Sequence, residues 1–140
     1  MSTTSKVTGL SWTTLSVDDS GGVARDIRND ITNFDFSTPR GVQDVTGIDK
    51  AAIERLLLLA DFSINLNGVF DPGTNLAHAV FSTVPSTSVL RSVNITTNGK
   101  NLNQGTAVLF TDYQVTRAQS GELTWVAPGV LASGAVPTWS

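Results

Sequence analysis

A period of two residues runs through the segment from Arg55 to Phe70. From Leu56 onward every even position is apolar or glycine, and from Asp61 to Asn67 every odd position is polar. Because successive side chains of a strand point to opposite faces, this period predicts one long strand, which the turn signal at 71–73 ends. The core-facing side chains are expected to be Phe62, Ile64 and Leu66, and the wet-face side chains Asp61, Ser63, Asn65 and Asn67.

Residues 50–60 carry a second signal that conflicts with the first. Asp49 could cap a helix, and the alanines and leucines that follow it are good helix formers. However, the alternation that is clear after Ala60 extends back without a phase break, and neither glycine nor proline separates the two halves. A strand from about Arg55 is therefore favoured, with a helix over 50–60 as the alternative.

Further runs of apolar and polar residues, bounded by turn residues, predict a chain that is mainly β. The expected strands are Trp12–Val17, a return strand over 23–27, Ile31–Phe36, Ser88–Thr97, Thr106–Thr116 and Gly121–Ala127. The expected turns are Asp18–Gly22, Asn98-Gly99 and Ser120-Gly121, since glycine, asparagine and aspartate accept the positive φ of tight turns.

One helix is expected over 74–84, packed on the flank of the sheets. Its apolar residues recur at spacings of three and four and so share one helix face. They are Leu76, Ala77, Val80, Phe81 and Val84. Thr74 or Asn75 is the expected cap, and Pro85 is the expected stop.

Three segments have no clear period. Residues 37–50 are polar and long for a connection between strands, and such connections are usually functional or disordered. Residues 128–140 contain prolines and glycines, so a C-terminal arm is expected there, with an N-terminal arm over 1–10. Trp139 has two interpretations: an anchor for another chain, which we favour, or a side chain docked on its own core.

Composition and charge narrow the function. The chain of 140 residues fits a single domain, has no cysteine and carries a formal charge of −3, with a pI near 4.8. Thiol catalysis and zinc–thiolate sites are thereby excluded. Proteins that grip DNA carry a basic stripe, whereas the basic residues here are scattered, so the chain could enclose DNA without binding it. No apolar run approaches the ~20 residues that span a bilayer, and neither targeting nor membrane association is expected.

The sequence offers no credible catalytic, cofactor-binding or metal-ligating cluster. His78 is the single histidine and has no cysteine partner, so a structural or surface role is expected. The acids at 18–19 and 26–30 lack the spacing of a calcium loop, and turn chemistry explains them better. Gly21-Gly22 lacks the lysine that follows in a phosphate loop. We therefore expect no enzyme, no cofactor and no metal site.

Several short stretches follow one another in a specific order and spacing, from about residue 7 to residue 139. They are Arg25-Asp26-Ile27, Asn29–Thr32, Thr38–Gly47, Glu54-Arg55-Leu56, Ala60–Ser63, Asn67–Asp71, Leu109–Gln114 and Gly134–Trp139. Together they closely resemble the tail tube proteins, also called major tail proteins, of long non-contractile-tailed bacteriophages.

The resemblance implies a β-sandwich or half-barrel with one flanking helix, a long loop and extended terminal arms. It also implies hexameric rings stacked into the tube through which DNA leaves the virion, similar in fold to the tubes of contractile tails and type VI secretion systems. The implied partners are further copies of the chain and the tape measure, tail terminator and distal tail proteins. The implied location is the virion tail, assembled in the bacterial host cytoplasm.

Candidate site residues follow from this resemblance together with the segments described above. The assembly interface is expected at Arg40, Val42, Val45, Ile48, Val136 and Trp139. The lumen or wet face is expected at Asp61, Ser63, Asn65 and Asn67.

The alternative is a β-sandwich binding module, either a capsid decoration or a tail-associated domain that recognises a host surface or carbohydrate. Sugar sites usually bring exposed aromatic rings together with acids and amides. Trp12, Trp125 and Trp139 are dispersed in the sequence and predict no such cluster.

Overall fold

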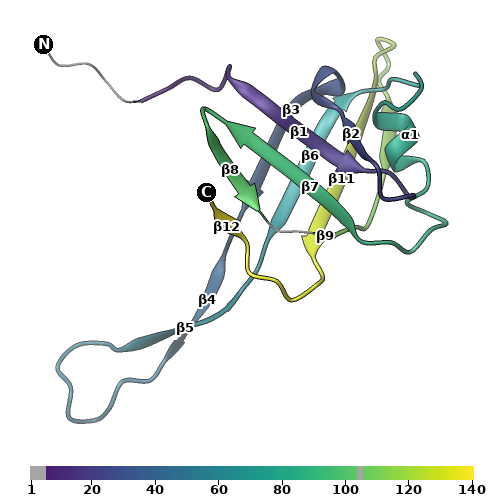
Figure 1. The fold of residues 1–140 in the computed structure, drawn as a ribbon. Helices are drawn as coiled ribbons and strands as arrows, with labels where there is room; N and C mark the ends of the chain where they lie inside the picture. The colour runs from purple at the N-terminus through teal and green to yellow at the C-terminus, as the bar shows by residue number, and fades with distance from the viewer. Residues whose placement is uncertain (1–5, 104–105) are drawn as a thin grey trace, which may run out of the picture.

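The computed structural model describes residues 6–103 and 106–140, with the side chain of Thr106 excepted, and the fold is mainly β as predicted (Figure 1). The strands are β1 (Trp12–Asp18), β2 (Ala24–Asp26), β3 (Ile31–Ser37), β4 (Arg40–Asp44), β5 (Arg55–Ala60), β6 (Ser63–Val69), β7 (Arg91–Thr97), β8 (Lys100–Asn103), β9 (Thr106–Phe110), β10 (Gln114–Arg117), β11 (Leu123–Leu131) and β12 (Thr138–Trp139). The helices are a short 3-10 turn, η1 (Arg28–Asp30), and α1 (Ala77–Phe81).

The strands form two layers that are joined through one strand pair. One layer runs β2-β1-β7-β8-β12, and the other runs β3-β6-β11, with β9 and β10 both on the far side of β11. The two layers join where the start of β7 pairs with β9, and every pair is antiparallel. Between the free edges of β1 and β3 the barrel stays open, which agrees with the predicted sandwich or half-barrel.

The core lies between the layers and is closed at one end by α1 (Figure 1). The predicted core residues in and just before β6 are buried: Phe62, Ile64 and Leu66 are each at most 1% exposed. Phe81 of α1 packs its ring 5.1 Å from that of Phe110 and 5.2 Å from that of Trp125. No helix among the described residues is long and apolar enough to cross a membrane.

The helix is shorter than the predicted 74–84. Asn75 has a φ of 63°, which no helical residue adopts, so α1 begins only at Ala77. Neither Thr74 nor Asn75 caps it; instead the buried carboxylate of Asp30 accepts the Ala77 N–H at 2.9 Å. The helix ends before Pro85, consistent with the clash that proline makes with a helical residue before it.

The predicted long strand over 55–70 is two strands in different sheets. The strand from Arg55 is confirmed, and the helix alternative for 50–60 is wrong. The break comes at Asp61, whose side chain accepts the Phe62 N–H at 2.8 Å while its own N–H donates to the Pro39 carbonyl at 3.0 Å. β6 then joins the main sheet, whereas β5 pairs with β4 outside it. The apolar period before the break therefore does not lead into the core.

Several other strand boundaries also differ from the predicted ones. The loop expected over 37–50 contains β4, the strand expected over 106–116 splits into β9 and β10, and the one expected from Ser88 begins at Arg91. β8 was not predicted. β11 continues through Pro128 to Leu131, so the irregular C-terminal segment starts later than residue 128. Pro128 is accommodated because its carbonyl faces the gap between β9 and β10, where it accepts the Thr111 N–H. The nitrogen of Pro128 faces the same gap, so the N–H that proline lacks is not needed for strand pairing there.

Candidate assembly interface

β4 and β5 form a hairpin that projects from the sandwich; we call residues 40–60 the arm (Figure 1). Val42 pairs with Leu57 and Asp44 with Arg55, and a bulge lies between Arg40 and Val42. Among the described residues, β4 and β5 make their backbone contacts mainly with each other. A two-stranded hairpin of this kind is marginally stable by itself in water.

A set of polar contacts fixes the shape of the arm near its tip. The Thr46 hydroxyl donates to Asp44 at 2.6 Å and accepts the Glu54 N–H at 2.8 Å, while the Val45 N–H donates to the Glu54 carbonyl at 3.0 Å. These hydrogen bonds from Thr46 hold the pKa of the Asp44 carboxyl below its usual value. Because the contacts bridge both strands, they define the tip without a hydrophobic core.

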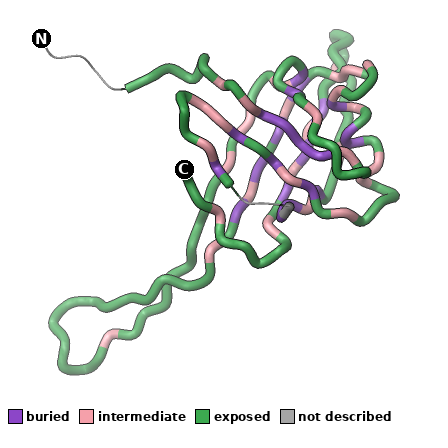
Figure 2. The backbone as a smooth tube through the Cα atoms, viewed as in Figure 1, coloured by how far each residue is buried: buried purple, intermediate pink, exposed green. Residues whose placement is uncertain are grey.

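The arm is exposed along nearly its whole length (Figure 2), and many of its exposed side chains are apolar. The leucines of β5 are 56%, 58%, 44% and 91% exposed from Leu56 to Leu59, and Ile48 at the tip is fully exposed. Exposed apolar surface of this extent, gathered on one protrusion, marks an interaction site in soluble proteins. Sequence reasoning missed the leucines as interface residues because their period was assigned to the core.

The predicted interface residues fall into two groups. Arg40, Val42, Val45 and Ile48 all lie exposed on the arm, where Arg40 also donates from Nε to the Leu58 carbonyl at 2.8 Å. Val136 joins Arg40, Gly41 and the end of β5 around an open hollow at the base of the arm. The fold therefore brings Val136 to the arm from the other end of the sequence, and the role of these residues in assembly stays a prediction.

Trp139 lies in β12 and not in a free tail. It pairs with Leu102 of β8, and the Asn101 and Ser140 backbones exchange hydrogen bonds at 3.0 and 2.9 Å. Its ring lies 6.0 Å from that of Phe36, yet the residue is 54% exposed. Docking on its own subunit therefore leaves part of the Trp139 side chain exposed, and its role as an anchor for another chain stays a prediction.

Aromatic side chains gather at the open side of the barrel, which the sequence analysis did not foresee. Trp12 meets Phe34 edge to face at 4.8 Å, and Phe34 stacks with Phe36 at 6.2 Å, so Trp12 and Trp139 flank one row of rings. The expectation that the tryptophans show no cluster is therefore wrong for these two. Trp125 is buried and donates from Nε1 to the Val69 carbonyl at 3.0 Å.

The predicted wet face of β6 is exposed or half-buried at Asp61, Ser63, Asn65 and Asn67. The register places these strand residues beside outward side chains of β3 and β11; Ser37 and Ser63, for example, share a hydrogen bond at 3.0 Å. We call the outward side chains of β3, β6 and β11 the wet face. Within these described strands the face carries Asp35 as its charged residue and neither lysine nor arginine.

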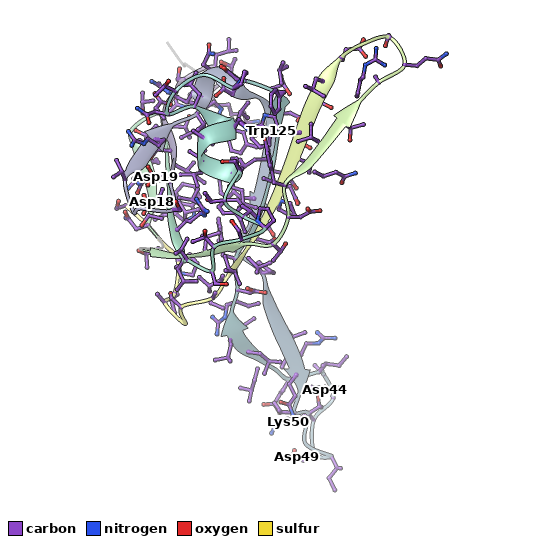
Figure 3. All side chains as sticks on the ribbon, turned by 90° about the vertical axis from the view of Figure 1, so that its right-hand side faces the viewer. Asp18, Asp19, Asp44, Asp49, Lys50 and Trp125 are labelled. Atoms are coloured by element: carbon purple, nitrogen blue, oxygen red, sulfur yellow. The ribbon has the colours of Figure 1, made fainter. Side chains whose placement is uncertain are left out.

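The remaining candidates for chemistry have structural roles. Asp19, which Figure 3 labels on the body, accepts the Gly21 and Val23 N–H groups and so shapes the predicted turn. His78 bonds through Nδ1 to the Tyr113 hydroxyl at 3.1 Å. Within the described residues, no three metal-ligating side chains converge. Figure 3 also shows Asp49 and Lys50 at the arm tip, far from Asp19 on the body.

Burial raises the pKa of the Asp30 carboxyl, and the neighbouring Asp71 carboxyl raises it further. The same pairing lowers the pKa of Asp71, whose carboxylate also accepts the Gly73 N–H at 3.0 Å. Asp71 is therefore the stronger acid of the two and ionises first as the pH rises, next to the start of α1, where Asp30 serves as the cap.

The chain matches no protein-family model and no curated protein. It does match solved structures. One is a chain from the virion of a native gene transfer agent (GTA) particle, with a TM-score of 0.71 and 15% identity over 96% of this chain and 99% of that one. Another is a chain from the tail of an empty GTA particle with C6 symmetry, with a TM-score of 0.66, 15% identity and the same coverage. This likeness is one of fold.

Proposed function

We propose that the chain is a structural subunit of the tail tube of a bacteriophage or phage-like particle, and that its copies form hexameric rings that stack. The fold likeness carries the proposal: it extends over nearly the whole of both chains, and one of the two comes from a tail with C6 symmetry. The order of short motifs in the sequence points to the same family.

Edge strands supply the physical reason for ring formation. In the described chain β3 pairs with β6 alone and β10 with β11 alone, so the layer has open edges on both sides. Such edges promote pairing with another chain. When two different edges of identical subunits meet, the contact is heterologous, and it closes into a ring if the rotation permits.

The wet face suits the inner wall of a tube that releases DNA. A wall with lysine or arginine would bind phosphates at many points at once, and the salt-dependent attraction would slow the duplex. Around Asn65 the outward side chains are amides and hydroxyls on β3 and β6 and the apolar Val126, Pro128 and Val130 on β11, with Asp35 and Asp61 as acids. We therefore place Asp61, Ser63, Asn65 and Asn67 toward the lumen, where DNA passes without specific binding.

The arm and Trp139 are assigned to contacts between copies. A hairpin without a core gains stability when a neighbour covers its apolar side chains, so it favours the assembled state over the isolated subunit. In this function the chain is no enzyme and needs no cofactor. Its further partners are the tape measure, terminator and distal tail proteins, and its place is the virion tail after assembly in the host cytoplasm.

A second candidate function, a glycan-binding module, is supported by the row of rings from Trp12 to Trp139. Aromatic faces are the usual platforms for sugars. Titration of the purified chain with host-surface glycans, followed by tryptophan fluorescence, tests this candidate. Saturable quenching by a glycan, with no assembly at any concentration, would favour it over the tube.

Light scattering of the purified chain over a wide concentration range, with negative-stain microscopy, tests the proposed function. Rings or tubes that grow with concentration are the expected result. Monomers under all conditions, including the presence of a tail-initiating complex, would refute it.

A further inference from the structure

The chain carries both an apolar protrusion and a hollow with an aromatic floor and a polar rim. The protrusion is the distal half of the arm, residues 45–57, whose apolar side chains include Ile48, Ile53 and Leu56, each at least 56% exposed. The hollow lies between β1 and β3, has a volume of about 570 Å³ and is lined in part by Trp12, Ile31, Phe34 and Phe36. We call it the aromatic hollow.

The hollow exists because two strands lack partners on facing edges. β2 pairs with β1 only at Ser16–Asp18, so in the described chain the first half of β1 has no strand beside it there. β3 is likewise open on this side. Arg28 bridges the gap, donating to the Trp12 carbonyl at 3.0 Å. Half-buried rings are thus left without a covering layer.

The arm of one copy cannot fill the hollow of the same copy. β4 continues beyond the end of β3 and carries the tip away from the sandwich (Figures 1 and 2). The tip contacts, from Asp44 to Glu54, are internal to the arm. Because the tip points away from its own sandwich, it can meet a hollow only on another copy. Such a contact is heterologous and repeats from copy to copy.

Charge favours the arm as the occupant. The arm holds three basic residues and three acidic ones, so its formal charge is zero and the net −3 belongs to the rest of the chain. In the hollow, Arg28 is neutralised by Asp26, with Nη2 and Oδ2 2.9 Å apart, and Asp35 is the other charged residue of the lining. The arm can therefore approach another copy without the repulsion that two acidic bodies experience, and the desolvated contact buries no unpaired cation from the hollow.

We propose that the distal half of the arm docks in the aromatic hollow of another copy of the chain. This inference rests on the proposed function, and it adds the receptor surface for the arm. Leucine and isoleucine side chains pack against the Trp12 and Phe34 rings, which is the arrangement of an anchor in an aromatic pocket. Each copy offers one arm and one hollow, so every docking leaves a further arm and a further hollow for the next.

Disulfide cross-linking tests the docking, because the natural chain has no cysteine. The double variant Ile53→Cys/Thr32→Cys carries one thiol on the arm and one on the exposed rim of the hollow. The matched control, Ile53→Cys/Val23→Cys, moves the second thiol to an exposed turn of the body. The single-cysteine variants serve as further controls, because they can form disulfides only between the same position on two copies. The proteins are concentrated until they assemble, oxidised and run on non-reducing gels, and the linked peptides are identified by mass spectrometry.

The expected result is a ladder of covalent oligomers joined by bonds between 32 and 53, formed at least about tenfold faster than any ladder of the control, because docking raises the local thiol concentration. A second variant, Thr32→Glu, should raise the concentration needed for assembly by about tenfold or more. It should lower the melting temperature of the monomer only slightly, because the hydrogen bond that it loses, from the Thr32 hydroxyl to the Asn67 carbonyl at 3.4 Å, is long and exposed. If rings or tubes form but the double variant and its control form covalent oligomers equally slowly, the docking is overturned and the tube function stands. Absence of any assembly would overturn both, and quenching of Trp12 by a glycan with unhindered assembly would assign the hollow to a sugar.

Discussion

Replacing Leu57 and Leu59 with asparagine should abolish assembly while leaving the subunit folded. The two side chains are alternate residues of β5 and so lie on the same face of the arm. They are 58% and 91% exposed in the isolated chain, and no core contact is lost when they are replaced. The change therefore acts on what the arm touches in another copy and not on the sandwich.

The size of the effect follows from the exposed fractions. Together the two leucines expose the equivalent of about one and a half side chains, and full burial of one leucine stabilises by roughly 1.5–3 kcal/mol, which gives roughly 2–4 kcal/mol per contact. Since 1.4 kcal/mol corresponds to a factor of ten, the concentration at which the chain assembles should rise about 30-fold to 1,000-fold. Stability of the monomer should stay within about 0.5 kcal/mol, as for other surface substitutions.

The assembly concentration is measured by sedimentation across a dilution series, which separates assembled from free protein. The stability of the monomer is measured by thermal unfolding of dilute protein. Val23→Asn is the control, since Val23 is 50% exposed but lies on the β1–β2 turn of the body. It should change neither quantity. Unchanged assembly in the double variant would refute the assignment of the arm, and a large loss of monomer stability would show that the arm supports the subunit itself.

Four further outcomes are expected. Leu66→Ala should cost about 2–5 kcal/mol of unfolding free energy and Asn65→Ser less than about 0.5, and equal costs in denaturant unfolding would contradict the register of β6. Filter binding should detect no DNA at moderate salt, whereas steeply salt-dependent retention would contradict the neutral wall. Deleting 134–140 should stop tube formation and cost the monomer only about 1–3 kcal/mol, the worth of two backbone hydrogen bonds, and normal tubes in the microscope would argue against a C-terminal contact. Burial raises the pKa of Asp30, so protonated Asp30 stabilises the folded chain; this stabilisation is complete below the pKa of the unfolded state and is lost as the pH rises through the pKa of the folded state. Asp30→Asn should remove that loss above about pH 4 when the unfolding free energy is measured against pH. Identical pH profiles of the two proteins would refute this expectation.

The sequence pattern predicted well those parts of the fold whose side chains are buried within one chain. In β6 the alternation of Ile64 and Leu66 with Asn65 and Asn67 has a single physical explanation, a strand with one buried face, and the structure confirms it. The turn at Asn98-Gly99 was equally clear, since both residues adopt a positive φ. Patterns of this kind are readable because the burial that shapes them occurs within one chain.

The arm could not be predicted in the same way. Leu56 to Leu59 have the periodicity and hydrophobicity of core residues, and nothing in the local sequence distinguishes burial within a chain from exposure on a protrusion. The break before Phe62 involves a hydrogen bond from the Asp61 N–H to the Pro39 carbonyl, which joins two different segments of the chain. Such a contact exists only once the chain is folded.

The aromatic hollow and β8 were missed for related reasons. Trp12, Phe34 and Trp139 are far apart in the sequence, and only the open edge between β1 and β3 brings their rings together. β8 is short and mostly polar, so its strand character comes from pairing with β7 and β12 and not from its composition.

Cryo-electron microscopy with helical reconstruction of the assembled protein would show the proposed tube and its lining directly. We expect tubes of stacked rings with six copies each, the side chains of Ser63, Asn65 and Asn67 toward the lumen and each arm against a neighbouring copy. A map in which the wet face points outward, or in which the copies associate without a central channel, would contradict it.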